Sequence, residues 1–286
     1  MAAPPVANPL VGIIGGTGRM GLWLRRFLEG RGLRVEVASR RTPVTPAELA
    51  RKADVLILSV PISIVERLAA DLGPLVRPEG LLMDLTSLKA APLAAMLAAS
   101  SCEVVGAHPL FGPDTPEVTG HTVVLCPGRG ESWLPWLKGL FEEAGARVVV
   151  APPARHDRAM AAVQGLTHFD TLAFGLTLAR LKLPLSELVE FATPNFRLKL
   201  KQAARLLRQD PALYAEIEAR NPEVPSALYI LARVITDLRE AVLSGDIESF
   251  SALFGEAAEY FATLSEADYR DLTRQFLAAC QAEEAD

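Results

Sequence analysis

His108 is the residue of this chain that is best placed for proton chemistry. It lies in the stretch GAHPLFGPD (residues 106–114), directly after an apolar run that predicts a buried strand. Ligands of an open α/β sheet bind beyond the carboxyl ends of its strands, so His108 would lie beside a bound nicotinamide. An unprotonated imidazole there can accept a hydroxyl proton while hydride leaves the same carbon. We therefore predict that His108 is catalytic.

Three cations share one face of a predicted helix. Arg197, Lys201 and Arg205 stand at positions i, i+4 and i+8. The chain has 34 acidic and 29 basic side chains, a net charge of −5, so a basic cluster without acidic partners at the same spacing is informative. A solvated basic face is the alternative. We predict that these three residues bind a substrate carboxylate.

A glycine-rich turn follows the first predicted strand. Gly16, Gly18 and Gly21 have the spacing G-x-G-x-x-G after the apolar run 10–14, and a helical apolar spacing follows over residues 20–28. This context is typical of a dinucleotide site, where backbone approaches a pyrophosphate and a helix N-terminus faces the anion. A glycine turn without a ligand is the alternative. The predicted cofactor-binding residues of this loop are Gly16, Thr17, Gly18, Arg19, Met20 and Gly21.

The second predicted strand, residues 33–38, ends in a hydroxyl and two guanidinium groups. Ser39, Arg40 and Arg41 stand where an NAD-binding fold usually carries Asp or Glu for the ribose 2′-hydroxyl. Because Arg forms forked, charge-assisted hydrogen bonds to phosphate, these residues favour a 2′-phosphate. A solvated loop, with the cofactor selected elsewhere, is the alternative. We predict that these three residues bind the cofactor and that NADP is favoured over NAD.

The elements around these residues predict an α/β fold with a helical second half. Strands at 54–60, 81–85, 103–107, 122–125 and 147–150 alternate with helices, which is typical of a Rossmann-like doubly wound parallel sheet. After residue 152 the pattern is helical, with helices expected at 154–181, 184–208, 211–221, 226–243, 247–264 and 266–282. We expect a loose tail at 1–9, a dinucleotide-binding domain at 10–152 and an all-α dimerisation domain at 153–286.

Composition excludes several other classes of protein. The acidic balance favours neither nucleic acid nor another polyanion as a partner. No apolar run reaches the length of a membrane span, and the first residues do not read as a secretory signal. The three cysteines are odd in number and widely spaced, which indicates a reducing compartment, so a cytoplasmic protein is expected. The four histidines form no metal-ligand pattern with the carboxylates, and no metal is predicted.

Six motifs together resemble one known family. GGTGRMG, LSVP, DLTSLK, HPLFGPD, HDRAMAAVQGLTHF and ARLLRQDPALYAEI occur in this order, as in the prephenate/arogenate dehydrogenases of tyrosine biosynthesis. The resemblance runs from about Val11 to the C-terminal helices. It implies NAD(P)-dependent oxidative decarboxylation of prephenate to 4-hydroxyphenylpyruvate, in which hydride leaves C4 and CO2 leaves C1. Arogenate, which would give tyrosine directly, is the alternative substrate, because no residue separates a pyruvyl from an alanyl side chain. A homodimer through the helical domain is also implied.

The resemblance implies roles for residues of both halves. By position, His108 corresponds to the catalytic histidine that takes the proton of the 4-hydroxyl, and Ser87 to the serine that holds the same hydroxyl. His168 corresponds to a substrate-binding histidine of the helical domain. Arg205 corresponds to the arginine that grips a substrate carboxylate, and Lys201 to a second basic contact.

Four further positions follow from the same motifs. Asp114 lies where the family often has an acidic residue near the pocket mouth, and we expect it to bind substrate. Val60 and Pro61 of the LSVP motif are expected at the cofactor. Gly165 is a departure, because some members carry a histidine there, and the substrate contacts at that point stay open.

Two other functions remain compatible with this pattern. A different two-domain dehydrogenase, of the β-hydroxyacid or imine-reducing kind, would share the Rossmann half and a helical half. It would rely on a helical lysine near the nicotinamide and would not need His108 together with Arg205. A nucleotide-sensing dimer would bind NADP without turnover of either cyclohexadienol.

Overall fold

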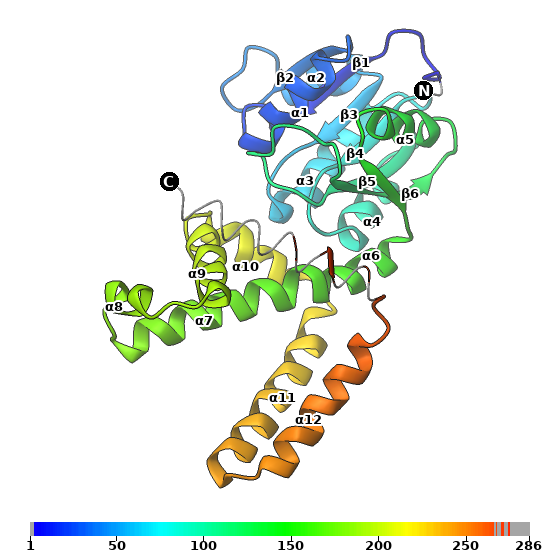
Figure 1. Cartoon of the computed structure of the whole chain (residues 1–286). Coiled ribbons are helices and arrows are strands. Elements are labelled where there is room, and N and C mark those ends of the chain that lie inside the picture. Colours follow the sequence, from blue (N-terminus) through cyan, green and yellow to red (C-terminus); the bar gives the residue numbers. More distant parts are fainter. Residues whose placement is uncertain (1–2, 266, 268–269, 272–273, 275–286) are drawn as a thin grey trace. The chain divides into compact units, whose positions relative to one another are not determined.

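The chain forms two compact units in a computed structural model that describes residues 3–265, 267, 270–271 and 274 (Figure 1). The first, here called the sheet unit, comprises Met1–Ala161 and Ala212–Glu223. The second, the helical unit, comprises Ala162–Pro211 and Val224–Asp286. This division differs from the domain boundary expected after residue 152. Most of the helix expected at 266–282 lies outside the described residues.

A seven-stranded sheet forms the centre of the sheet unit. Its strands run in the order β2-β1-β3-β4-β5-β6-β7, and all neighbouring pairs are parallel except β5 with β6. The prediction of a mostly parallel, doubly wound sheet is therefore confirmed. The strands are β1 (Leu10–Ile14), β2 (Arg34–Ala38), β3 (Val55–Leu58), β4 (Leu81–Asp84), β5 (Glu103–Pro109), β6 (Thr122–Arg129) and β7 (Arg147–Val150).

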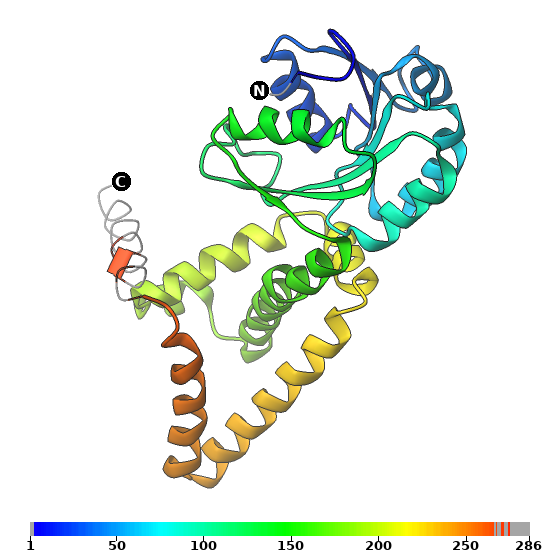
Figure 2. The ribbon, with the colours of Figure 1, turned by 90° about the vertical axis from the view of Figure 1, so that its right-hand side faces the viewer.

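Helices cover both faces of this sheet (Figures 1 and 2). α1 (Arg19–Glu29) and α5 (Leu134–Glu142) pack on one face, and α2 (Pro46–Lys52), α3 (Ile62–Leu72) and α4 (Ala90–Ala99) pack on the other. α6 (Pro153–Met160) and most of α10 (Pro211–Arg220) also belong to this unit. α2 and α4 were not predicted from the sequence.

Alternation along the central strands builds the two cores. In β1, Ile13 faces the core that contains Trp23 of α1, whereas Ile14 faces the core that contains Val65 of α3. β3 divides in the same way, with Ile57 on the first side and its neighbours on the second. Each fully buried aliphatic side chain stabilises the fold by about 1.5–3 kcal/mol. The carboxyl edge of the sheet is thus fixed from both faces.

The helical unit contains five α-helices among the residues described. They are α7 (Thr167–Leu181), α8 (Leu185–Glu190), α9 (Pro194–Leu207), α11 (Val224–Ser244) and α12 (Ile247–Phe261). The single helix expected at 184–208 is wrong, because the Thr193 side chain accepts a hydrogen bond from the Phe196 N–H and begins a new helix before Pro194. The helix expected at 154–181 is interrupted by a π-helix over Ala161–Leu166.

α11 and α12 form a helical hairpin, and Figure 1 shows the two helices joined at one end. Gly245 ends α11 with a φ of +71°, and the Asp246 side chain caps α12 by accepting from the Ser249 N–H at 2.9 Å. None of the helices that the structure describes is long and apolar enough to cross a membrane.

Candidate active site

His108 is buried in the sheet and does not stand in the loop after it. β5 runs through Pro109, two residues beyond the predicted strand end, because its antiparallel pairing with β6 continues through His108 and Val124. Only 3% of His108 is exposed. Burial lowers the pKa of its imidazole well below the ordinary value of 6.5, and the neighbouring His156 and Lys89 lower it further. The ring is therefore neutral near pH 7 and able to accept a proton.

A second histidine and a carboxylate lie behind His108. The Nδ1 atom of His108 lies 2.9 Å from Nε2 of His156, and Nδ1 of His156 lies 2.7 Å from Oδ1 of Asp157. Both partners come from α6 and are nearly fully buried. Burial alone would raise the pKa of Asp157, but hydrogen bonds from His156 and from two backbone N–H groups lower it overall. Asp157 is therefore a carboxylate.

Ser87 lies at the same sheet edge as His108. It is half-buried in the turn after β4, the strand that pairs with β5, where Asp84 lies opposite Gly106. Thr86 donates to Oδ2 of Asp84 from its backbone N–H at 2.9 Å and its hydroxyl at 2.5 Å. These hydrogen bonds fix the turn that carries Ser87.

A buried ion pair stabilises the turn after β4. Nζ of Lys89 lies 2.5 Å from Oδ2 of Asp84 and donates to the Ala107 carbonyl oxygen at 2.8 Å. Neither charged side chain is exposed to solvent. Loss of one partner would leave an uncompensated buried charge, which costs about 3–5 kcal/mol. Lys89 therefore links the end of β4 to β5 next to the turn.

The glycine loop has the geometry of a phosphate cradle. Gly15 has a φ of +80°, and a Cβ on it would come within 2.2 Å of the Ser59 carbonyl oxygen. A Cβ on Gly16 would lie 2.5 Å from Cγ1 of Val37. Gly18 is the N-cap of α1 and offers no side chain to its first N–H groups. This backbone fits a pyrophosphate, and Gly15 is a loop residue that the motif register did not include.

Ser39, Arg40 and Arg41 leave the sheet beside the glycine loop. Ala38 of β2 lies opposite Ile14 of β1, and the Gly15 N–H donates to the Ala38 carbonyl oxygen at 2.9 Å. The Ser39 hydroxyl accepts from the Arg41 N–H at 3.2 Å, and both arginines are exposed. The structure thus brings this triplet and the glycine loop to one edge.

Val60 and Pro61 follow the neighbouring strand β3 at that edge. A Cβ on Gly15 would lie 2.9 Å from Cγ1 of Val60, so the two loops are in close contact. Pro61 is the N-cap of α3. Both residues therefore adjoin the loop that would hold the cofactor.

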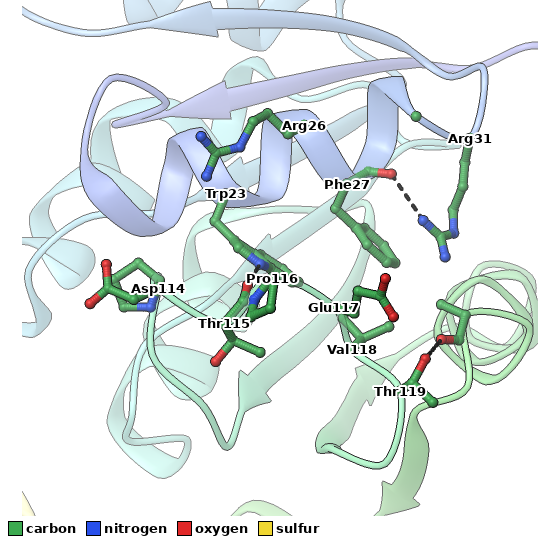
Figure 3. Close-up of a pocket in the computed structure, with 13 residues that line it drawn as sticks. Trp23, Arg26, Phe27, Arg31, Asp114, Thr115, Pro116, Glu117, Val118 and Thr119 are labelled. Carbon is green, nitrogen blue, oxygen red and sulfur yellow. Dashed lines mark hydrogen bonds between the residues drawn. The ribbon is translucent and has the colours of Figure 1, made fainter. Parts of the chain in front are cut away.

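Asp114 is paired with the glycine loop. Its Oδ2 atom lies 2.6 Å from Nη2 of Arg19, the first residue of α1, and both side chains are exposed. A groove of about 680 Å³ begins there, between α1 and the loop after β5 (Figure 3). Trp23 extends from α1 toward this loop and donates from Nε1 to the Thr115 carbonyl oxygen at 2.8 Å (Figure 3). Of the predicted substrate residues, the groove contains Asp114 alone.

The helical unit holds the remaining predicted residues. Arg197, Lys201 and Arg205 lie on α9 and are exposed. His168 lies on α7 and is half-buried, and burial lowers its pKa. α7 and α9 pack together through an ion pair of 2.9 Å between Lys199 and Asp170 and an edge-to-face contact between two phenylalanines. Two adjacent helices therefore supply these four side chains.

Family models cover both halves of the chain. The model described as the nucleotide-binding domain of prephenate dehydrogenase matches residues 29–150. The model described as the dimerization domain of prephenate dehydrogenase matches residues 152–256. The chain belongs to the prephenate dehydrogenase family. The family that the six motifs predict is thereby confirmed.

Curated relatives agree with this assignment. A probable arogenate/prephenate dehydrogenase of Methanocaldococcus jannaschii is 34% identical over 273 residues, which are 89% of this chain and 61% of that protein. A T-protein of Enterobacter agglomerans is 36% identical over 261 residues, or 90% of this chain and 68% of that protein. A 4-amino-4-deoxyprephenate dehydrogenase of Streptomyces pristinaespiralis is 36% identical over 231 residues, covering 79% of this chain and 76% of that protein. The chain thus spans under two thirds of the M. jannaschii relative.

Solved structures share the fold. Prephenate dehydrogenase from A. aeolicus, in complex with hydroxyphenyl propionate and NAD+, has a TM-score of 0.72 and 20% identity, covering 91% of this chain and all of that chain. Synechocystis arogenate dehydrogenase has a TM-score of 0.68 and 20% identity, covering 89% of this chain and 99% of that chain. At these identities the likeness concerns the fold.

Sequence reasoning missed the residues behind His108. His156 and Asp157 stand in the HDRAM stretch, which the family motif includes but to which no role was assigned. Their adjacency to each other was the available signal, whereas their approach to His108 depends on the fold. Among the described residues, no group of three His, Cys, Asp or Glu side chains is placed to hold a metal ion.

Proposed function

We propose that this chain is an NAD(P)-dependent prephenate dehydrogenase that converts prephenate to 4-hydroxyphenylpyruvate and CO2 in tyrosine biosynthesis. The observation that carries the proposal is a buried, neutral His108 at the carboxyl edge of the sheet that also carries the glycine cradle. The other two-domain dehydrogenases considered above would need no histidine there. The family assignment supports the same reading.

In the proposed reaction the base binds a proton transiently and releases it before the product leaves. A bound nicotinamide would supply the hydride acceptor, held by the backbone of Gly16 and Gly18 and by the N-terminus of α1. His108 accepts the proton of the 4-hydroxyl as hydride leaves C4 and a carbonyl forms. The C1–CO2 bond then breaks, and its electron pair completes the aromatic ring. His108 returns the proton to the phenolic oxygen, so no net proton is gained or lost.

Other residues of the chain would position the reactants. The half-buried Ser87 would hold the 4-hydroxyl, because its turn leaves the sheet beside β5. Arg205, Lys201 and Arg197 are exposed cations on one helix, and prephenate carries two carboxylates for them to bind. His168 would contribute a further substrate contact from α7.

NADP is the cofactor that we propose in preference to NAD. Arg40 and Arg41 are exposed beside the glycine loop, and no acidic residue stands in the triplet at 39–41 to receive a 2′-hydroxyl. A 2′-phosphate would find two guanidinium groups there. The preference for NADP is thus supported by the positive charge and hydrogen-bond donors of the two arginines.

We also propose a cytoplasmic homodimer that assembles through the helical unit. Large apolar side chains are exposed along the hairpin, among them Tyr229, Ile235, Phe250 and Phe254. A surface this apolar is typical of a partner interface. The name of the family model for residues 152–256 agrees.

A substrate and cofactor matrix tests the proposed function. Formation of reduced nicotinamide is measured with prephenate, arogenate and 4-amino-4-deoxyprephenate, each with NAD and with NADP. We expect the highest kcat/KM for prephenate with NADP. A higher value with arogenate would assign the alternative substrate. Binding of NADP without turnover of any of the three would favour a nucleotide sensor.

A further inference from the structure

Three buried side chains form a single hydrogen-bonded row that ends at the proposed base. Asp157, His156 and His108 are 2%, 3% and 3% exposed. The two contacts between them are 2.7 Å and 2.9 Å, which are normal hydrogen-bond distances. The row joins α6 to β5 across 48 positions of sequence. It lies wholly inside the sheet unit.

The chemistry of the first residue gives the row a direction. An ionised carboxylate can only accept, so His156 must donate to Asp157 from Nδ1. If that is the single proton of the ring, Nε2 of His156 is an acceptor. In that arrangement His108 donates from Nδ1 to His156. Its own Nε2 carries no proton and is the atom that can take one from a substrate.

Asp157 is held rigidly by contacts on its other side. Its Oδ1 and Oδ2 atoms accept from the backbone N–H groups of Lys89 and Ala90, each at 2.9 Å. These groups begin α4, whose own N-cap residue supplies no side-chain hydrogen bond. Nδ2 of Asn221 donates to the Asp157 carbonyl oxygen at 2.9 Å. The carboxylate that orients His156 is thus fixed by a helix terminus.

The charged groups around His108 indicate what the Asp157 carboxylate would contribute during the reaction. Lys89 approaches from the turn after β4 with its positive charge paired to Asp84, and His156 approaches from α6. Cys126 on the neighbouring β6 is neutral, because burial raises its pKa to about 12. A proton taken up by His108 would therefore be unfavourable unless Asp157 offsets it through His156.

We propose that His156 and Asp157 are positioning residues of this enzyme. They fix His108 in the tautomer with the proton on Nδ1, and they stabilise its imidazolium while it holds the hydroxyl proton. The proposal rests on the proposed function for its catalytic consequence. The tautomer itself is a property of the protein without substrate.

Nitrogen NMR of the four histidines tests the tautomer directly. With ¹⁵N-labelled histidine, His108 and His156 should both show a protonated Nδ1 and an unprotonated Nε2 near pH 7. Asp157→Asn should change the tautomer of His156 and with it that of His108. A protonated Nε2 on His108 in the unsubstituted protein would overturn the proposal. This measurement stands even if no tested substrate is turned over.

Kinetics of matched variants test the catalytic consequence. Asp157→Asn keeps the shape of the side chain and should lower kcat by about 10²–10⁴-fold while leaving KM for prephenate nearly unchanged. His156→Gln can still accept from His108 through Oε1, so its kcat should exceed that of His156→Ala by at least about tenfold. Asn221→Ala removes a buried hydrogen bond to the Asp157 backbone and should lower the melting temperature while leaving the pH profile of kcat/KM in place.

The outcomes distinguish failure of the positioning role from failure of the proposed function. Unchanged kcat in Asp157→Asn, or equal rates for the glutamine and alanine variants at His156, would overturn the positioning role while the proposed function stood. A kcat loss in Asn221→Ala as large as that in Asp157→Asn would assign the effect to structure and would also overturn it. Absence of turnover in the unsubstituted protein would refute the proposed function alone.

Discussion

Arg19 and Asp114 form an ion pair of 2.6 Å that joins the glycine loop to the loop after β5. The two residues are 95 positions apart, and one was expected at the cofactor and the other at the substrate. Both are exposed, so the pair contributes little to stability, at most about 1 kcal/mol. The main effect of the pair is electrostatic, because Asp114 partly neutralises the positive charge of Arg19 at the start of α1.

Replacing Asp114 by Asn should therefore strengthen cofactor binding. The substitution keeps the size of the side chain and leaves the Arg19 charge available to a pyrophosphate at the helix N-terminus. We expect the Kd for NADP, measured by titration calorimetry, to fall severalfold and the melting temperature to change little. Arg19→Ala is the control and should weaken binding. A weaker Kd in Asp114→Asn would contradict this view of the pair.

Arg40→Ala should separate the two nicotinamide cofactors. Only NADP offers a 2′-phosphate to this exposed guanidinium, so KM for NADP should rise by roughly tenfold or more while KM for NAD stays nearly constant. Steady-state kinetics with both cofactors measure the difference. Exposed Arg51 on α2 is a matched control, because Arg51→Ala removes an equal charge from a residue outside the triplet. A parallel change of both Michaelis constants would remove the argument for NADP.

Arg205→Ala should affect binding of the substrate more than its conversion. The guanidinium would meet a carboxylate that is already charged before the reaction, so its loss removes uniform binding. KM for prephenate should rise by about 30- to 150-fold, or about 2–3 kcal/mol. KM for the cofactor should change little. Arg208, exposed at the end of α9, supplies the control Arg208→Ala. A fall in kcat alone would refute this role.

Acid should destabilise the protein through the two histidines whose pKa is lowered by burial, His108 and His168. Folded His108 has a pKa below its unfolded value, so the unfolded chain binds more protons between the two values. The stability contributed by the neutral ring is complete above about pH 6.5 and is lost as the pH falls toward the folded pKa. His168 acts in the same direction.

Denaturant unfolding at about pH 7.5 and about pH 5.5 measures this loss. His108→Asn should reduce the difference between the two free energies of unfolding, because asparagine does not titrate. His121 is exposed and lies beside Phe111, so His121→Asn is the control. An equal pH dependence in His108→Asn and the unsubstituted protein would show that His108 is not buried in its neutral form.

Strong hydrophobic patterns in the sequence predicted the framework correctly. β7 has the predicted bounds, and β1 also coincides with its apolar run, because branched aliphatic residues make up three of the four positions of β7 and four of the five positions of β1. α4 was missed because AAPLAAMLAA is apolar on all sides and gives little helical contrast. The break before α9 was missed although Thr193 and Pro194 carry an ordinary start signal.

The candidate site was predictable only as far as local motifs reach. Ser87 follows the end of β4 and His108 lies near the end of β5, and the predicted strand ends alone marked their stretches. The contact between His108 and His156 depends on how α6 returns to β5, which no local spacing encodes. Gly15 escaped the motif because the positive φ belongs to the residue before the G-x-G-x-x-G register.

The pH profile of kcat/KM for prephenate, compared between the unsubstituted protein and His108→Asn, tests the central claim most directly. The account predicts an ascending limb below about pH 6.5, because burial lowers the pKa of the base, and a loss of kcat of about 10²–10⁴-fold with little change in KM in the variant. The limb should be absent from the variant. Retention of both the rate and the limb in His108→Asn would contradict the account, because another group would then be the proton acceptor.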